Sequence, residues 1–158
     1  MNAAGVASPV VGQQAPALVL PDQRGEPYRL SETLRDRHAL VVFFPFAFSS
    51  ICTGELLDIQ LNIDEFVNDR LQVLAVSCDS TYSLRAWGAQ EGYRFPLLSD
   101  FWPHGRAARD WGVLDEDTGM ARRGTFLVDP AGTITWSLVH EADQAREVGV
   151  LHRAVRDL

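Results

Sequence analysis

The middle of the chain carries two kinds of hydrophobic pattern. Residues 40–44 and 71–77 are short, almost continuous apolar runs rich in β-branched residues, which predicts two buried strands. Between them, residues 55–67 place apolar side chains at helical spacing, which predicts a helix with one buried face. A strand, a helix and a strand in this order form a βαβ unit with parallel strands and a right-handed crossover.

Shorter elements surround this unit. Before it, strands at 17–20 and 28–30 are expected to form a hairpin, and Ser31 is expected to cap a single helical turn. After it, periodicity and turn residues predict, in order, a helix at 82–91, an extended piece at 95–98, a short helix at 106–111, a hairpin at 124–138 and a C-terminal helix from 142 to about 155.

The order of these elements predicts an α/β protein with a thioredoxin-like fold. A βαβ unit is followed by a helix, a β-hairpin and a closing helix, so that a central mixed sheet is flanked by helices. The N-terminal β-hairpin is an extension of that arrangement. At 158 residues the chain is long enough for one domain with its own core. We therefore expect a single domain over residues 14–158, preceded by a loose tail at 1–13.

Composition narrows the classes of function. The formal net charge is −7 and no run of lysine or arginine stands out, so nucleic acid and anionic membranes are poor partners. No segment approaches the ~20 apolar residues of a membrane-spanning helix, and the N-terminus lacks the basic and apolar regions of a signal peptide. The cytoplasm, where thiols stay reduced, is the expected compartment.

The cysteines and histidines lack the spacing of a metal site. The 2 cysteines are too few for a disulfide scaffold, and the 4 histidines are scattered along the chain. We therefore expect neither a bound metal nor a cofactor.

One cysteine lies in a position that favours a reactive thiol. Cys52 falls between the strand predicted at 40–44 and the helix that follows, in or near the first helical turn. The unpaired N–H groups and positive dipole end of a helix stabilise an anion there, which favours the nucleophilic thiolate. A dithiol pair of the CxxC kind is excluded, because the second position of such a pair holds Glu55.

The residues around Cys52 resemble a known motif. Pro45, Ser49 and Cys52 match the Pro-x-x-x-Thr/Ser-x-x-Cys signature of the peroxiredoxins, and Arg123 lies at the start of a predicted strand, where that family keeps its active-site arginine. The segment 95–105 and the residues after Arg123 resemble the small, one-cysteine subgroup of alkyl hydroperoxide reductase E type. The likeness extends from about residue 12 to the C-terminal helix and implies a thiol-dependent peroxidase.

The resemblance implies a role for each matching residue. Cys52 would attack a hydrogen peroxide or organic hydroperoxide and become a sulfenic acid, which an external thiol or redoxin would reduce. Arg123 and Ser49 would donate hydrogen bonds to the reacting atoms, and Pro45 would shield the sulfur from water. Glu55 would orient an arginine. Structural readings compete, since Ser49 would serve equally as a helix cap and Arg123 as a solvated surface charge.

The second cysteine leaves an alternative open. Cys78 follows the strand at 71–77 and has the surroundings of a small, inert buried residue. It is nevertheless expected at the same sheet end as Cys52, because the two strands are parallel, so a two-cysteine peroxiredoxin with Cys78 resolving is the rival enzyme. A third reading is a redox sensor or chaperone-like protein without rapid turnover. A homodimer is expected through the loops at Phe46 and at Phe101 and Trp102.

Overall fold

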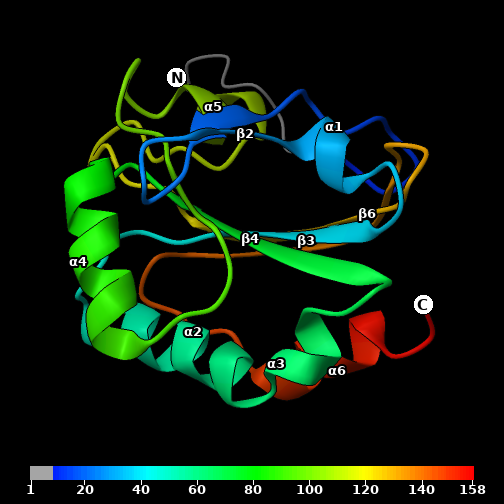
Figure 1. Ribbon diagram of the computed structural model, residues 1–158. Helices are drawn as coiled ribbons and strands as arrows, with labels where there is room; N and C mark the ends of the chain where they lie inside the picture. The colour runs from blue at the N-terminus through cyan, green and yellow to red at the C-terminus, as the bar shows by residue number, and fades with distance from the viewer. Residues whose placement is uncertain (1–8) are drawn as a thin grey trace.

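The computed structural model describes residues 9–158 and shows a sheet covered on both faces (Figure 1). Its strands are β1 (Val19–Pro21), β2 (Pro27–Arg29), β3 (His38–Phe43), β4 (Leu71–Ser77), β5 (Leu97–Ser99), β6 (Arg123–Val128) and β7 (Ile134–His140). Its helices are α1 (Leu30–Thr33), α2 (Ser50–Leu61), α3 (Ile63–Phe66), α4 (Thr81–Glu91), α5 (Arg106–Asp110) and α6 (Val148–Val155).

The central sheet is mixed and has 5 strands in the order β5-β4-β3-β6-β7. β3 pairs in parallel with β4, and β4 with β5, whereas β6 is antiparallel to both β3 and β7. β1 and β2 form a separate antiparallel hairpin. The mixed sheet flanked by helices and the N-terminal hairpin confirm the predicted fold class.

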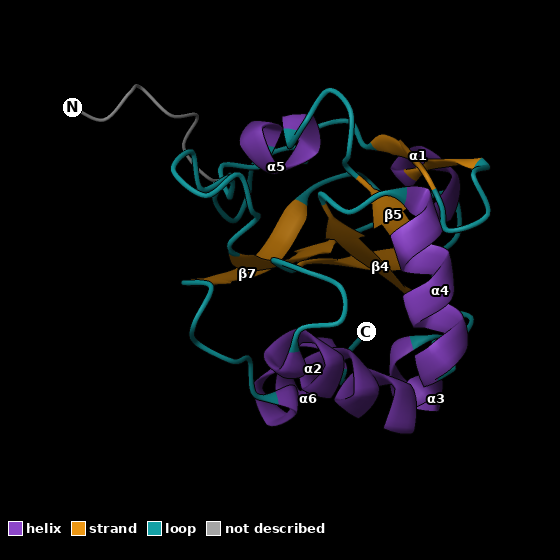
Figure 2. Cartoon of the chain, turned by 90° about the vertical axis from the view of Figure 1, so that its left-hand side faces the viewer, coloured by secondary structure: helices purple, strands orange, loops and turns teal. Residues whose placement is uncertain are grey.

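The strands in the middle of the sheet are apolar because both of their faces are covered. Successive side chains of β3 point to opposite faces, so that Leu40 and Val42 join one hydrophobic core while Val41 and Phe43 join the other. Figures 1 and 2 show α2, α3 and α6 on the first face, with α4 at its side, and α1, α5 and the hairpin over the second.

Two helix predictions need correction. The helix expected over 55–67 is two helices, because α2 ends at Asn62 and α3 begins after it. The Asn62 side chain donates to the Asp58 carbonyl at 2.8 Å, and such local bonding competes with a continuous helix. The cap expected at Ser31 is wrong, because α1 begins one residue earlier, at Leu30, with Arg29 in the cap position and no side-chain hydrogen bond.

The C-terminal helix is shorter than expected. It begins at Val148 rather than at 142, and the preceding segment 142–147 is irregular. The backbone of this segment bonds to buried side chains of other elements, since the Ala142 carbonyl accepts from Arg123 and the Arg146 amide donates to Glu55. A helix through these residues would use the same backbone groups internally.

The start of the described chain is attached to the sheet. Gly12 N–H donates to the Ile134 carbonyl at 2.8 Å, and Ile134 N–H donates to the Gln13 carbonyl at 2.9 Å. The other part of the tail expected over 1–13, residues 1–8, lies outside the described residues. Within the described range, no helix is long and apolar enough to cross a membrane.

Candidate active site

Cys52 lies where β3 passes into α2, beyond the carboxyl end of a central strand. The chain leaves β3 after Phe43, turns through residues 44–49 and enters α2 at Ser50, so the cysteine falls in the first helical turn, as predicted. The residue is fully buried. In this position the Cys52 side chain lies near the unpaired N–H groups and the positive dipole end of the helix, which favour an anion.

Ser49 is the N-cap of α2. Its hydroxyl accepts a hydrogen bond from the Cys52 N–H at 3.4 Å and donates to the Phe46 carbonyl at 3.1 Å. Ser49 therefore acts as a helix cap, which is the structural role that the sequence left open. Pro45 is buried in the same loop, at the end of β3. The motif residues therefore gather on one short segment that leads to the sulfur.

Arg123 reaches Cys52 from β6, the antiparallel neighbour of β3. Its Nη2 donates to the Cys52 sulfur at 3.3 Å, and its Nε donates to the Ala142 carbonyl at 2.8 Å. The side chain is buried, so it is not the solvated surface charge that the sequence alone allowed. Arg122 is the surface residue of the pair, partly exposed and 3.7 Å from Glu141.

Glu55, one helical turn after Cys52, binds two arginines. Its Oε1 forms an ion pair with Arg123 Nη1, and its Oε2 accepts from the Arg146 backbone N–H at 2.5 Å and from Arg146 Nε at 3.2 Å. The carboxylate is buried, and a buried carboxylate needs such partners because it has left water. Glu55 therefore contacts the arginine that reaches the Cys52 sulfur, and the orienting role expected for it stays a prediction.

Arg146 is the site residue that the sequence did not reveal. From the irregular segment before α6 it donates to the Phe43 carbonyl, to Thr125 Oγ1 at 3.1 Å and to Glu55. Burial lowers the pKa of the Arg146 guanidinium, and the Glu55 carboxylate opposes that change. Its neighbours in the sequence are good helix formers, so local propensity predicted an exposed helical position and gave no signal of burial.

Aromatic side chains close the site on the side of α4. Trp87 Nε1 donates to Thr53 Oγ1 at 3.2 Å, and the Tyr93 hydroxyl donates to the Thr53 carbonyl at 3.1 Å. Phe44 and Trp87 are in ring contact, with centroids 5.2 Å apart. Burial raises the pKa of Tyr93 above its ordinary value. These rings separate the cysteine from water on this side and hold the first turn of α2.

Cys78 directly follows β4 and is buried, with a free thiol like that of Cys52. Because β3 and β4 are parallel, both cysteines follow strand ends at the same edge of the sheet, as predicted. The pKa of Cys78 is raised to about 12, most of all by burial and further by the carboxylates of Asp100 and Asp79. The two thiols therefore have opposite electrostatic surroundings, guanidinium at one and carboxylates at the other.

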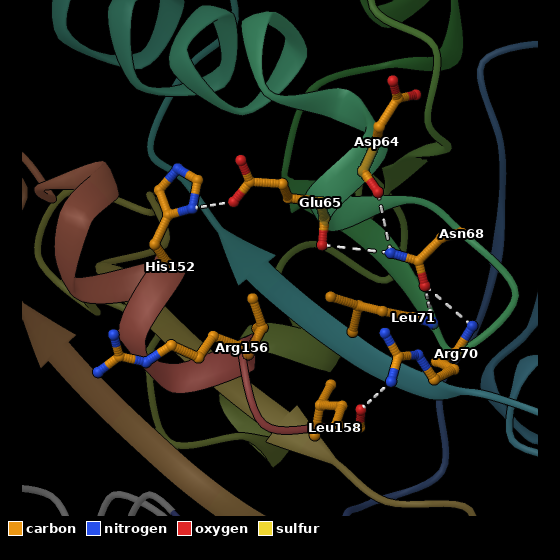
Figure 3. Close-up of a pocket in the computed structure, with 9 residues that line it drawn as sticks. Asp64, Glu65, Asn68, Arg70, Leu71, His152, Arg156 and Leu158 are labelled. Carbon is orange, nitrogen blue, oxygen red and sulfur yellow. Dashed lines mark hydrogen bonds and ion pairs between the residues drawn. The ribbon is translucent and has the colours of Figure 1, made fainter.

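A separate surface pocket of about 280 Å³ lies at the other end of the parallel strands, against α3 and α6 (Figure 3). Two contacts cross this pocket: His152 Nδ1 is 2.5 Å from Glu65, and Arg70 donates to the Leu158 carbonyl at 2.5 Å. These contacts fasten α6 to α3 and to the start of β4. The pocket contains neither cysteine, so it is not part of the site.

Comparison with known proteins agrees with this geometry. The family model described as AhpC/TSA family matches residues 11–137. Alkyl hydroperoxide reductase E of Mycobacterium tuberculosis is 40% identical over 137 residues, which cover 87% of this chain and 90% of the relative. Thioredoxin peroxidase of Echinococcus granulosus is 33% identical over 149 residues, which cover 88% of this chain and 76% of the relative.

Solved structures show the same fold. Peroxidoxin BcpB from Mycobacterium tuberculosis superposes with a TM-score of 0.82 at 25% identity and covers 94% of this chain and 97% of its own. Enterococcus faecalis AhpC superposes with a TM-score of 0.81 at 31% identity and covers 93% of this chain and 90% of its own. A thioredoxin-like fold with a buried helix-start cysteine beside an arginine defines the class of thiol-dependent peroxidases. This chain belongs to the AhpC/TSA family and is a peroxiredoxin.

The contacts of Glu55 generate a stability prediction. Glu55→Gln removes the one carboxylate between Arg123 and Arg146 and leaves two buried guanidinium groups without a counter-charge. We expect the free energy of unfolding in urea to fall by about 3–5 kcal/mol. Glu116→Gln is the matched control, because Glu116 pairs with Arg109 at the exposed surface, and it should leave the unfolding midpoint almost unchanged. Equal losses in the two variants would contradict the argument.

Proposed function

We propose that this protein reduces hydrogen peroxide and organic hydroperoxides through Cys52, and that an external thiol or redoxin regenerates it. The observation that carries the proposal is the contact of 3.3 Å between Arg123 Nη2 and the Cys52 sulfur, in a buried site at the start of a helix. It places a permanent cation where negative charge develops during peroxide cleavage.

The reaction follows from these positions. The Cys52 thiolate attacks one peroxide oxygen, so that an S–O bond forms while the O–O bond breaks. The sulfur is oxidised to sulfenic acid, and the released alkoxide or hydroxide takes up a proton to leave as alcohol or water. During this displacement negative charge spreads from sulfur over both oxygens. The Arg123 guanidinium then stabilises the transition state more than the ground state, and the Ser49 hydroxyl does so once its hydrogen turns from the Phe46 carbonyl to the peroxide.

The charges of the buried cluster favour the thiolate. Arg123 and Arg146 bring two positive charges, and Glu55 brings one negative charge. One positive charge is therefore left uncompensated beside the Cys52 sulfur. Because a buried charge is stable only when it is paired, this positive charge compensates the negative charge that the sulfur carries during its attack on the peroxide. Pro45 also favours negative charge on the sulfur, because its ring has no N–H and shields the sulfur from water without competing for hydrogen bonds.

The surroundings of Cys78 favour the one-cysteine cycle over the two-cysteine alternative. A resolving cysteine must attack the sulfenic acid as a thiolate. With its pKa raised to about 12, Cys78 stays protonated near neutral pH and is a poor nucleophile. An external thiol or redoxin is then needed to complete the cycle. We also propose a cytoplasmic location, where thiols stay reduced, and cell fractionation tests this.

Exposed aromatic side chains support a homodimer. Phe46 is 51% exposed in the loop after β3, while Phe101 and Trp102 are 54% and 81% exposed in the loop after β5. Both loops follow parallel strands at the same edge of the sheet as Cys52. Aromatic residues are enriched in protein interfaces, and leaving this many in water is unfavourable. We propose that a second copy of the chain covers them.

The cysteine assignment predicts two different variant phenotypes. Cys52→Ser should abolish catalytic peroxide consumption, whereas Cys78→Ser should turn over at close to the wild-type rate with a small thiol or redoxin as reductant. After one equivalent of peroxide, intact mass should show one added oxygen that dimedone traps at Cys52. Activity that persists in Cys52→Ser would disprove the proposal. A Cys52–Cys78 disulfide with loss of turnover in Cys78→Ser would establish the two-cysteine cycle, and oxidation without turnover would indicate a sensor.

The guanidinium of Arg123 should account for a large part of the rate at which peroxide oxidises Cys52. Arg123→Ala removes a charged donor from the reacting atoms, so stopped-flow oxidation of Cys52 should slow about 10²- to 10³-fold. Arg123→Lys should recover only part of this loss, because an ammonium is a point charge without the planar fork. A change of less than about threefold in both variants, with the fold intact by circular dichroism, would remove Arg123 from the mechanism.

The dimer proposal predicts a change in size. Wild-type protein at micromolar concentration should sediment as a dimer, and Trp102→Glu should shift it towards monomer because a charge would be buried in the interface. Leu61→Glu is the matched control, since Leu61 is 74% exposed at the far end of α2 and should remain a dimer. Sedimentation of the wild type as a monomer would rule the dimer out.

A further inference from the structure

The loop that carries the motif is attached to the neighbouring strand by one carboxylate. Ala47 N–H donates to Asp79 Oδ2 at 2.8 Å, and Asp79 lies just after the end of β4. The last backbone bond of β3 towards β4 is from Phe44 N–H to the Val76 carbonyl at 2.9 Å. Asp79 therefore extends the attachment into the segment that leads to Cys52.

This loop has an unfavourable backbone that must be compensated. Phe48, the residue after Ala47, has φ of 68°, in the left-handed region that disfavours any residue with a Cβ. Its side chain is 50% exposed, so burial of the ring stabilises this conformation only in part. Such strained residues persist where the surrounding structure holds them. The bond from Ala47 to Asp79 is directly adjacent to the strain.

The Asp79 carboxylate is itself held in place. Ser77 Oγ donates to Asp79 Oδ2 at 2.6 Å, and the Asp79 backbone N–H donates back to Ser77 Oγ at 3.3 Å. On the other side, Ser99 Oγ donates to the Asp79 carbonyl at 2.6 Å. Both serines are buried. The Ser77 hydroxyl of β4 therefore holds the Asp79 carboxylate, and the Ser99 hydroxyl of β5 holds the Asp79 backbone, which makes Asp79 a fixed acceptor rather than a mobile surface group.

We propose that Asp79 is a positioning residue for peroxide reduction: through its hydrogen bond to Ala47 it sets the loop 45–49, and with it Pro45 and Ser49, against Cys52. This inference rests on the proposed peroxidase function. Asp79 does not touch the sulfur; it acts on the groups that surround the peroxide. Because those groups must be placed accurately to stabilise the transition state, a loose loop slows oxidation of Cys52 more than it slows other reactions of the same sulfur.

The experiment separates the two halves of the catalytic cycle in the full-length protein. Asp79→Ala should slow single-turnover oxidation of Cys52 by hydrogen peroxide about 5- to 10-fold, as for loss of one hydrogen bond of ordinary strength. Reduction of preformed sulfenic acid by dithiothreitol should stay within about twofold of wild type, because it does not use the peroxide-binding groups. Asp79→Asn keeps an oxygen acceptor for Ala47 and should restore oxidation to within about threefold.

Asp22→Ala is the matched control. The Asp22 carboxylate is buried and, like that of half-buried Asp79, accepts backbone N–H groups, from Arg24 at 2.8 Å and Glu26 at 3.0 Å, but in the β1–β2 turn. It should lower stability without changing either step. Equal slowing of both steps in Asp79→Ala, or oxidation within about twofold of wild type, would overturn the inference. A wild type that does not react with peroxide would instead refute the peroxidase function.

A milder variant keeps the test valid if Asp79→Ala does not fold. Ser77→Ala removes the hydroxyl that holds Asp79 Oδ2 and leaves the carboxylate in place. We expect oxidation to slow about two- to threefold while reduction by dithiothreitol is unchanged. An unchanged oxidation rate in Ser77→Ala, with Asp79→Ala unfolded, would count against the positioning role.

Discussion

The burial of two guanidinium groups with a single carboxylate is the constraint on which the rest of this structure depends. Arg123 comes from β6, Arg146 from the segment before α6, and Glu55 from α2, so one charge cluster joins three parts of the chain. In a low-dielectric interior none of these charges is stable without the others. The excess positive charge lies against the Cys52 sulfur. The same cluster therefore holds the elements together and surrounds the sulfur to which we assign peroxide reduction.

The two cysteines lie at the same edge of the sheet but have different electrostatic surroundings. Both follow the ends of parallel strands, and both are buried. Cys52 has the helix start and a guanidinium as neighbours, which favour its anion. Cys78 lies near two carboxylates, which favour its neutral form. The difference comes partly from the chain next to each cysteine, a helix start at Cys52 and Asp79 at Cys78, and partly from Arg123 and Asp100, which other segments contribute.

The sequence predicted what depends on local pattern and missed what depends on distant contacts. β3, β4 and α4 follow from apolar runs and helical spacing, and the place of Cys52 at a helix start follows from their order. The break at Asn62 and the late start of α6 depend on side-chain and tertiary hydrogen bonds that periodicity does not record. Arg146 was missed for the same reason: its segment has helical propensity, and its burial is decided by Glu55, 91 residues away.

The position of Arg146 in the chain also bears on synthesis. Cys52, Glu55 and Arg123 are all translated before it, and β7 is complete before the segment 142–147 leaves the ribosome. A nascent chain that ends at β7 lacks one of the two cations and the carbonyl of Ala142 that fixes the other. The cluster cannot close on such a chain. The surroundings of the Cys52 sulfur therefore depend on a segment that is translated after the other members of the cluster.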